Sequence, residues 1–600
     1  MKKLIVIFLA GLFLMACNET ILDKMPLDSI NDATLWSDPK LIDAFLTQIY
    51  GEITVFDKET STRYAIGFSD QYDDVKVGMF RIDYLSDECR IGWGKWVTGN
   101  QAGAKFGGIK IQGGVLEFWA YNTIRKVNEF IERLPSSPLA EDLKKLRIAE
   151  ARFLRAFIYF SMVKRYGGVP LITKVQQITD PEEELYPKRN SEEEIYNYVL
   201  SELDLCLPDL LSTSKTEKGR PSKAAALALK SRAALYAGSI ARYGKIQLNG
   251  LLGIAPSKAN DYFKISLDAS QAIIDGKEHS LYTKNLPDYV KNYQNLFTDK
   301  WNTEIIFARD HNAISLFKGG VGTGYDFWLA PAPNAWGYGN CLAPYLDMLD
   351  EYENNDGTPG KLDRAAIQQG LWTVEDLWGK KEPRFFATIY TQGTPWQGST
   401  LDFHRGLRLA DGSITMESVA GIPAYGLNYR KDEPAMGTSG VLKYLNPTFN
   451  NKNQEPISNV ALIVFRYGEI LLNHAEAAFE TGKTDIALNA INQIRSRAGV
   501  PPLTQISMDK IKHERKIELA FEGHRYWDIR RWRTAVNDLT RYFAGLRYIL
   551  DVETKKLQLQ VIENDHGSIT SPTFYEYNYY LPITLARTGS NPNLVENPGY

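Results

Sequence analysis

Three short motifs in this 600-residue chain carry residue types used in metal binding or catalysis, but none has the required spacing. His513-Glu514 begins like a zinc-protease helix, yet Ile517 stands where the second histidine belongs, so a single imidazole would face the metal. The segment 353–357 (ENNDG) resembles part of a calcium loop, but the first ligand position is Tyr352, which has no carboxylate. Gly320 to Gly324 lacks the strand-to-helix context of a dinucleotide site. We therefore predict a turn at 353–357, no catalytic residues, no metal site and no cofactor.

Hydrolytic chemistry has little support in the sequence. No Gly-x-Ser-x-Gly elbow occurs, and the seven histidines are scattered. The chain has 72 Asp and Glu residues, and a linear sequence does not give the carboxylate separation that glycoside hydrolysis requires. An exported glycosidase therefore stays open as an alternative.

The first seventeen residues, MKKLIVIFLAGLFLMAC, have the composition of a lipoprotein export signal. Lys2 and Lys3 precede an apolar run over 4–16 that is too short to cross about 30 Å of hydrocarbon. Small Ala16 precedes Cys17, so we expect residues 1–16 to be a signal peptide and Cys17 to carry the lipid. Two acyl chains would hold the mature chain, 17–600, on a membrane. The alternative is an ordinary cleaved signal with a coincidental cysteine.

Composition excludes some partners and favours others. The net charge of -3, with basic residues scattered, argues against nucleic acid. Cys89, Cys206 and Cys341 form neither a disulfide framework nor a metal site, although one disulfide pair stays open in an exported protein. The chain has 33 Tyr, 26 Phe and 12 Trp, more rings than a core usually takes, and sugar-binding or interface surfaces are natural places for them.

Helical periodicity occupies two parts of the chain, about 35–280 and about 460–540, with apolar residues at i, i+3 and i+4. The clearest stripe consists of Phe153, Phe157 and Phe160, and Gly167-Gly168 ends that helix. Four alanines between 224 and 228 would allow close contact between helices, so we predict a mostly α fold on a tetratricopeptide-like helical-repeat scaffold. The predicted helices lie at 41–50, 116–134, 139–166, 192–207, 223–243, 462–481, 485–498 and 508–539.

Between about 285 and 456 the periodicity gives way to short apolar runs separated by Gly, Pro, Asn and Asp. Irregular segments of this length in an ordered domain usually carry function. After residue 541 the sequence indicates an extended tail. We therefore expect one domain, in which the helical scaffold holds an irregular ligand-binding region.

Long blocks of the chain resemble the SusD/RagB family of outer-membrane nutrient-uptake lipoproteins. Residues 149–172, from AEARFLRA to RYGGVPLI, are similar to the signature helix of that family. Further blocks agree in order along the chain, and together they cover essentially the whole mature chain. These blocks are 381–388, 465–478, 489–499, 514–532 and 591–600.

The resemblance implies about four tetratricopeptide-like helix pairs and an irregular ligand-binding subdomain. It also implies a lipoprotein on the cell-surface face of the outer membrane, anchored through Cys17, that catalyses nothing. Members capture oligosaccharide or polysaccharide and deliver it to a SusC-like TonB-dependent transporter, over which they act as a lid. The alternatives are a peptide ligand, as in the RagB branch, and a structural lid that binds only its transporter.

A sugar site needs flat rings for the faces of the sugar and a few polar side chains for its rim, and two loops supply that mixture. The segment 87–100 resembles the family segment whose acidic pair and following Trp and Asn line the glycan site. The segment 325–340 lies in the irregular region and is chosen by location. The predicted ligand-binding residues are Asp87, Arg90, Trp93, Trp96, Asn100, Tyr325, Trp328, Trp336 and Tyr338. The alternative for each Trp is packing in a small core or contact with a protein partner.

Overall fold

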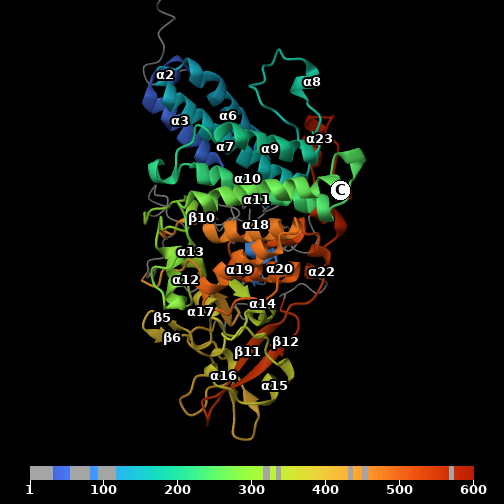
Figure 1. Ribbon diagram of the computed structural model, residues 1–600. Helices are drawn as coiled ribbons and strands as arrows, with labels where there is room; N and C mark the ends of the chain where they lie inside the picture. The colour runs from blue at the N-terminus through green and yellow to red at the C-terminus, as the bar shows by residue number, and fades with distance from the viewer. Residues whose placement is uncertain are drawn as a thin grey trace, which may run out of the picture.

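The computed structural model describes residues 32–53, 82–91, 116–314, 324–332, 339–429, 437–448, 457–565 and 573–600. Its helices pack against one another largely in chain order, as Figure 1 shows from top to bottom. The array is interrupted in sequence by residues 277–466 but not in space. The helix before this insertion, α11, packs directly against the helix after it, α18. The members of the array are α3 (Pro39–Glu52), α6 (Tyr121–Arg133), α7 (Glu141–Tyr166), α9 (Glu192–Cys206), α10 (Lys223–Tyr243), α11 (Ala259–Gly276), α18 (Tyr467–Glu480), α19 (Thr484–Ala498) and α20 (Met508–Glu518).

Local sequence explains where these helices begin and how closely they pack. Ser191 and Glu194 form a capping box at the start of α9, which satisfies backbone N–H groups that the first turn leaves free. In α10 the four alanines between 224 and 228 are buried. Gly238 of α10 lies against the Phe263 ring of α11, where a Cβ atom would come within 2.9 Å of the ring. The predicted role of small residues in close helix contacts is therefore confirmed.

The predicted phenylalanine stripe of α7 is buried in the core. Phe153 meets Phe307 edge-to-face, with ring centroids 5.5 Å apart. Phe160 meets Tyr236 of α10 in the same manner at 5.3 Å. These contacts are the preferred geometry of aromatic pairs, and they join α7 to its neighbours.

Three predicted helix boundaries were wrong. The helix predicted from 116 begins at Tyr121. Residues 462–466 form strand β10 (Leu462–Arg466), which pairs antiparallel with β2 (Ile305–Arg309), so the helix begins only at Tyr467. The predicted helix 508–539 is three helices: α20, α21 (Arg525–Arg531) and α22 (Ala535–Leu539). Phe521 and Gly523 have φ of +58° and +77°, which interrupts the right-handed helix between α20 and α21.

The inserted region 277–466 contains short elements around a few small sheets, and part of it forms the lower end of Figure 1. The predicted extended tail forms the hairpin β11 (Gly545–Asp551) and β12 (Leu557–Ile562), and β11 also pairs in parallel with β7 (Leu407–Arg408). The short helices are α12 (Tyr289–Thr298), α13 (Tyr325–Leu329), α14 (Leu346–Glu351), α15 (Arg364–Gln369), α16 (Val374–Trp378) and α17 (Pro383–Thr388). The other strands are β3 (Leu342–Pro344), β4 (Ile389–Thr391), β5 (Pro395–Trp396), β6 (Ser399–Thr400), β8 (Ile414–Thr415) and β9 (Ser439–Val441), while α2 (Asp32–Ser37), β1 (Cys89–Ile91), α8 (Glu182–Leu185) and α23 (Leu585–Ser590) lie outside this region.

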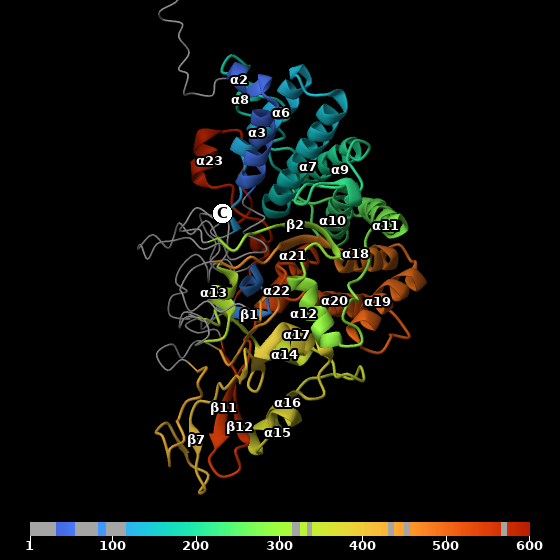
Figure 2. The same cartoon turned by 90° about the vertical axis from the view of Figure 1, so that its left-hand side faces the viewer.

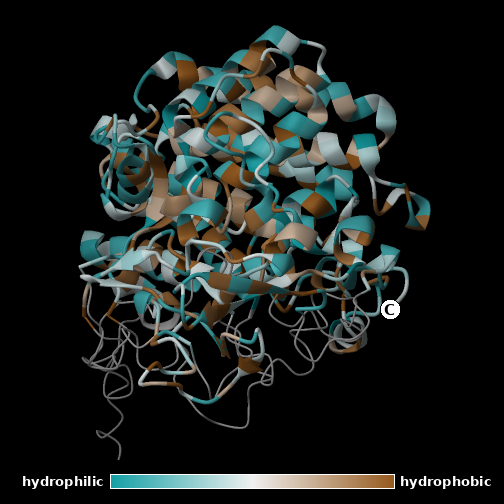
Figure 3. Ribbon diagram, turned by 90° about the horizontal axis from the view of Figure 1, so that it is seen from below, coloured by the Kyte–Doolittle hydropathy of each residue, from teal (hydrophilic) through white to brown (hydrophobic). Residues whose placement is uncertain are grey.

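The helices of this fold carry both hydrophobic and hydrophilic residues, and the central helices α10 and α18 are buried over most of their length. Viewed from below in Figure 3, hydrophobic and hydrophilic residues alternate along the helices. Within the described residues, no helix combines the length and the apolar character needed to cross a bilayer. Cys89, Cys206 and Cys341 are buried free thiols, so the disulfide that the sequence left open is not formed.

Candidate functional site

The two predicted ligand loops start from the same end of one small sheet. Strand β1 pairs antiparallel with β3, and Ile91 lies opposite Leu342. The chain therefore leaves β1 toward residue 92 at the edge where it enters β3 from residue 341. Asn340 donates its backbone N–H to the Ala330 carbonyl (3.1 Å), which brings the end of the second loop back to α13. Figure 2 shows α13 and β1 at neighbouring positions.

Asp87 precedes β1 and is hydrogen-bonded in the protein interior. Its side chain is 3% exposed and accepts hydrogen bonds from Lys516 (3.0 Å) and Arg525 (2.8 and 3.0 Å). Burial would raise the pKa of Asp87, but these two cations outweigh it and hold that pKa well below its usual range. Both carboxylate oxygens accept hydrogen bonds from these side chains, so Asp87 ties the start of β1 to α20 and α21. Its contact with a ligand stays a prediction.

Tyr325 likewise anchors the second loop. It is fully buried, and its hydroxyl donates to the Lys443 carbonyl at 2.5 Å. The neighbouring Asp326 accepts the backbone N–H of Asn446 (2.8 Å) and a short hydrogen bond from Ser458. Burial raises the pKa of Asp326 to about 6. The position of Tyr325 thus fixes α13, and its ligand contact stays a prediction.

Trp328 stands on α13, which places it at the root of the second loop. Trp93, Trp96, Asn100, Trp336, Tyr338 and Cys17 lie outside the described residues. Their roles in ligand binding and lipidation stay predictions.

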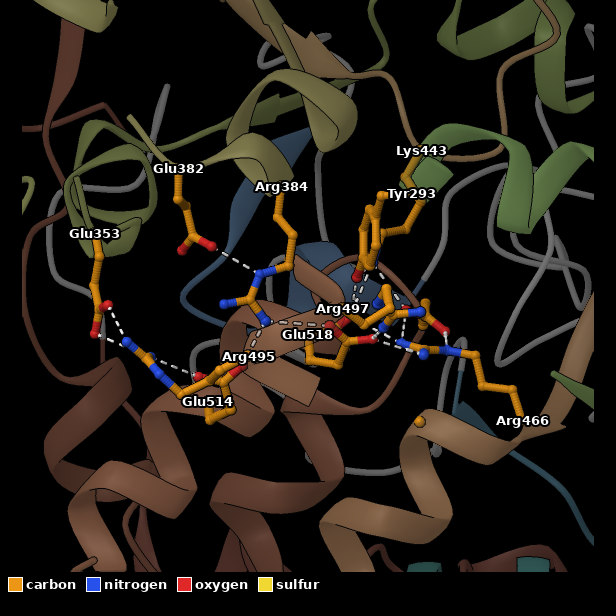
Figure 4. Close-up of polar contacts among 12 residues, drawn as sticks. Tyr293, Glu353, Glu382, Arg384, Lys443, Arg466, Arg495, Arg497, Glu514 and Glu518 are labelled. Carbon is orange, nitrogen blue, oxygen red and sulfur yellow. Dashed lines mark hydrogen bonds and ion pairs between the residues drawn. The ribbon is translucent and has the colours of Figure 1, made fainter. Parts of the chain in front are cut away.

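A buried ion network connects the helical array to this site (Figure 4). Lys443, whose carbonyl holds Tyr325, points its ammonium at Glu522 (2.8 Å). Arg466 binds the same carboxylate (2.7 and 2.8 Å) and also Glu518 (2.8 Å). Arg384 of α17 extends the network from Glu518 to Glu382 and Glu514, and Arg495 and Arg497 join it from α19. The root of the second loop is thus connected through Lys443 to a buried network of ion pairs.

Among the predicted ligand-binding residues that the structure describes, Arg90 lines a pocket. This pocket, which we call the arginine pocket, has a cavity of about 40 Å³. Its side chains include Arg90, Arg405, Tyr429, Arg547 and Asp565. Sequence reasoning missed Arg405, Tyr429 and Arg547, because they come from segments far apart in the chain. The pair Tyr425 and Tyr429 in a turn-rich segment was the signal available, and the structure stacks these rings at 5.5 Å.

No cluster of three or more His, Cys, Asp or Glu side chains able to hold a metal ion occurs in the described part of the chain. Asn354 and Thr358 close the predicted turn, with Asn354 N–H donating to the Thr358 carbonyl (2.8 Å) and Gly357 at a φ of +81°. His513 donates its Nε2–H to the Glu351 carbonyl (2.9 Å). Both motifs therefore have structural roles here.

Two family models match the chain. One, described as "SusD family", matches residues 303–600, and one described as "Starch-binding associating with outer membrane" matches residues 108–235. A SusD-like protein of Bacteroides ovatus is 23% identical over 100% of this chain and 98% of its own. The starch-binding protein SusD of Bacteroides thetaiotaomicron is 24% identical, with 80% of this chain and 76% of that protein covered. The crystal structure of a SusD-like protein from Bacteroides fragilis has a TM-score of 0.71 and 25% identity, with 96% of this chain and 100% of that chain covered.

Proposed function

Because this chain belongs to the SusD/RagB family of binding proteins, which are not enzymes, we propose that it captures glycans at the outer membrane. The family descriptions supply carbohydrate binding and membrane association. The single observation that carries the proposal is the shared root of the two aromatic loops at one edge of the β1–β3 sheet. Aromatic rings from two loops that begin at neighbouring positions can stack on the same sugar chain.

The finer proposal concerns attachment and partner. Lipidation at Cys17 would hold the protein on the cell-surface face of the outer membrane. From there it would hand an oligosaccharide to a SusC-like TonB-dependent transporter and act as its lid. The helices α6, α7, α9, α10, α11, α18, α19 and α20, which pack in succession, would make four tetratricopeptide-like pairs.

Titration calorimetry tests the capture role. A soluble form that begins after Cys17 is titrated with plant, host and microbial polysaccharides and with a peptide digest. Saturable heat with one glycan class and no released product supports glycan capture. Heat from peptides alone moves the protein to the peptide-uptake alternative, and turnover that a single Asp or Glu substitution abolishes makes it a glycosidase.

Two variants test the predicted loops. Replacing Trp96 and Trp328 together by alanine should weaken binding of the captured glycan about tenfold to a hundredfold, since each stacked ring contributes about 0.5–1.5 kcal/mol beyond its burial. Trp36→Ala is the matched control, because Trp36 packs on Phe45 and Phe130 at the other end of the scaffold. Unchanged affinity in the double variant would refute this site map.

Cell fractionation tests the anchor. Cys17→Ala should move the protein to the soluble fraction, whereas Cys206→Ala, which removes a buried thiol, should not. Membrane attachment of the Cys17 variant would contradict the lipoprotein assignment.

A further inference from the structure

The arginine pocket gathers positive charge from separate parts of the chain. Arg90 lies on β1, Arg405 precedes β7 and Arg547 lies on β11. Asp565 is the carboxylate among the lining residues, and it pairs with Arg90 at 2.9 Å. Three guanidinium groups therefore face one carboxylate within the described lining.

The position of Asp565 is set closely by the backbone. A Cβ atom on Gly545 would come within 2.4 Å of the Asp565 carboxylate, so the glycine leaves the space that this carboxylate occupies. Asp565 forms its ion pair with Arg90 and acts on Arg547 only through a weaker charge interaction, so one carboxylate offsets three cations. Burial and the charge of Arg405 both lower the pKa of Arg547, which indicates that the two guanidinium groups repel one another.

Two buried polar groups that line the pocket have incomplete hydrogen bonding. The Arg405 Nε–H and the Tyr429 hydroxyl are buried, and the contact between these two side chains falls short of normal hydrogen-bond geometry. The Arg405 guanidinium lies 5.6 Å from the centroid of the Tyr429 ring. Buried polar groups of this kind normally have a partner, and a bound ligand is one way to supply it.

The size of the cavity limits what fits. About 40 Å³ holds roughly three water-sized groups, which matches one small oxyanion and not a whole sugar ring. Guanidinium groups bind carboxylate and similar oxyanions with short, charge-assisted hydrogen bonds in a planar fork. Tyr425 is half-buried and stacks on the Tyr429 ring, which lines the pocket.

We propose that the arginine pocket binds an oxyanion substituent, a uronate carboxylate or a sulfate ester, of an acidic glycan. This inference rests on the proposed glycan-binding function and narrows its substrate class. Arg405 and Arg547 hold the oxyanion, the Tyr429 hydroxyl donates to it, and Arg90 with Asp565 keeps the wall of the pocket in place.

Calorimetry with matched pairs of saccharides tests the proposal. The probes are oligogalacturonate and its carboxyl-reduced form, and a carrageenan oligosaccharide and its desulfated form. We expect one acidic probe to bind more tightly than its neutral counterpart, and the binding to weaken as salt is raised. The two pairs distinguish a carboxylate from a sulfate.

Substitutions connect the binding to the pocket. Arg405→Gln and Arg547→Gln should each weaken binding of the acidic probe about tenfold to a hundredfold, since one charge-assisted hydrogen bond is lost. Arg547→Lys keeps the charge but loses the fork, so its effect should be smaller. Arg408→Gln removes the same charge outside the pocket, where Arg408 pairs with Asp551 (2.8 Å), and should bind like the wild type.

The outcomes separate this inference from the function on which it rests. Neutral glycans that bind as well as acidic ones, with full affinity in both pocket variants, would overturn the acidic substrate class and leave glycan capture standing. Absence of binding to every saccharide would overturn both. Melting temperatures equal to that of the wild type ensure that a loss in the Gln variants reports on the pocket.

Discussion

Glu518 of α20 lies at the centre of the network in Figure 4, and we predict that Glu518→Gln lowers stability strongly. Its side chain is fully buried. Arg466 lies 2.8 Å from Oε1 and Arg384 lies 3.1 Å from Oε2, while Arg497 makes a third, short hydrogen bond to Oε1. The substitution keeps the shape of the side chain but removes the negative charge that three guanidinium groups share.

The size of the effect follows from these distances. At about 4 Å between charge centres and an effective dielectric constant of about 20, each pair is worth about 4 kcal/mol, and desolvation of the carboxylate offsets several kcal/mol of the total. Breaking a buried ion pair by removing one partner typically costs about 3–5 kcal/mol. Since the entropy of unfolding is about 2.1 cal/mol/K per residue, we expect a fall in the melting temperature of roughly 2–4 °C.

The pH dependence gives a second readout. Burial would raise the pKa of Glu518, but Arg497, Arg466 and Arg384 outweigh it and hold the pKa well below its ordinary value. A carboxyl group with a lowered pKa in the folded state stabilises the fold above its unfolded pKa of about 4.3, and this contribution is lost as the pH falls further. The difference between wild type and Glu518→Gln should therefore be constant down to about pH 4.5 and shrink below it.

Thermal unfolding followed by circular dichroism measures this difference. Glu217→Gln is the control, because Glu217 is 68% exposed and its ion pair with Arg220 should matter little. Adding Arg497→Met to the Glu518→Gln variant should restore part of the loss, since it removes one positive charge from a network left with an excess, and Glu304, which also pairs with Arg497 (2.8 Å), keeps its ion pair with Arg466 (2.7 Å). If Glu518→Gln melts with the wild type, the network contributes no more than a surface ion pair and the reasoning is refuted.

Three further substitutions probe the support of the site by thermal unfolding. Asp87→Asn removes the carboxylate that Lys516 and Arg525 share and leaves them only Glu351 (3.0 Å) and Asp538 (3.5 Å), so it should cost up to about 3–5 kcal/mol; weaker glycan binding at an unchanged melting temperature would instead make Asp87 a ligand contact. Burial lowers the pKa of Lys381 to about 8. The unfolded chain keeps that proton to about pH 10.4, so stability should rise between pH 8 and about 9.5, and less so in Lys381→Met. Gly440→Ala places a Cβ 2.0 Å from the Tyr390 ring and should cost about 1–3 kcal/mol, whereas Gly51→Ala, with no atom within 4 Å, should not destabilise the fold.

Helical periodicity located the scaffold because long amphipathic segments carry a strong signal. The segment 223–243 is a helix with the predicted bounds, and 485–498 differs from α19 by one residue. The run 462–466 was misassigned, since five residues dominated by apolar side chains read alike as a buried strand or helix. Only its distant partner β2 decides between them. The break at Phe521 was also hidden, because a non-glycine residue in the left-handed region leaves little trace in sequence.

The candidate site was predictable only in part, for a related reason. The sequence identified the two aromatic segments, but it did not reveal that β1 and β3 join their ends. Asp87 was assigned to the ligand by family resemblance and Tyr325 by location, and neither ground reveals that both side chains are buried and hydrogen-bonded within the protein. The arginine pocket depends on the convergence of β1, the segment before β7, and β11, and no local pattern encodes such a convergence.

The arrangement separates the parts that hold the fold from the parts that would choose the ligand. Asp87 and Tyr325 fix the roots of the two loops to α20, α21 and Lys443, and Lys443 belongs to the buried ion network. A change in the loop residues between these roots leaves those contacts intact. One scaffold can therefore present different loop sequences at the same edge, which agrees with relatives that keep the fold at 25% identity or less. Specificity in this chain should then follow from the loops and the arginine pocket, while stability follows from the network beneath them.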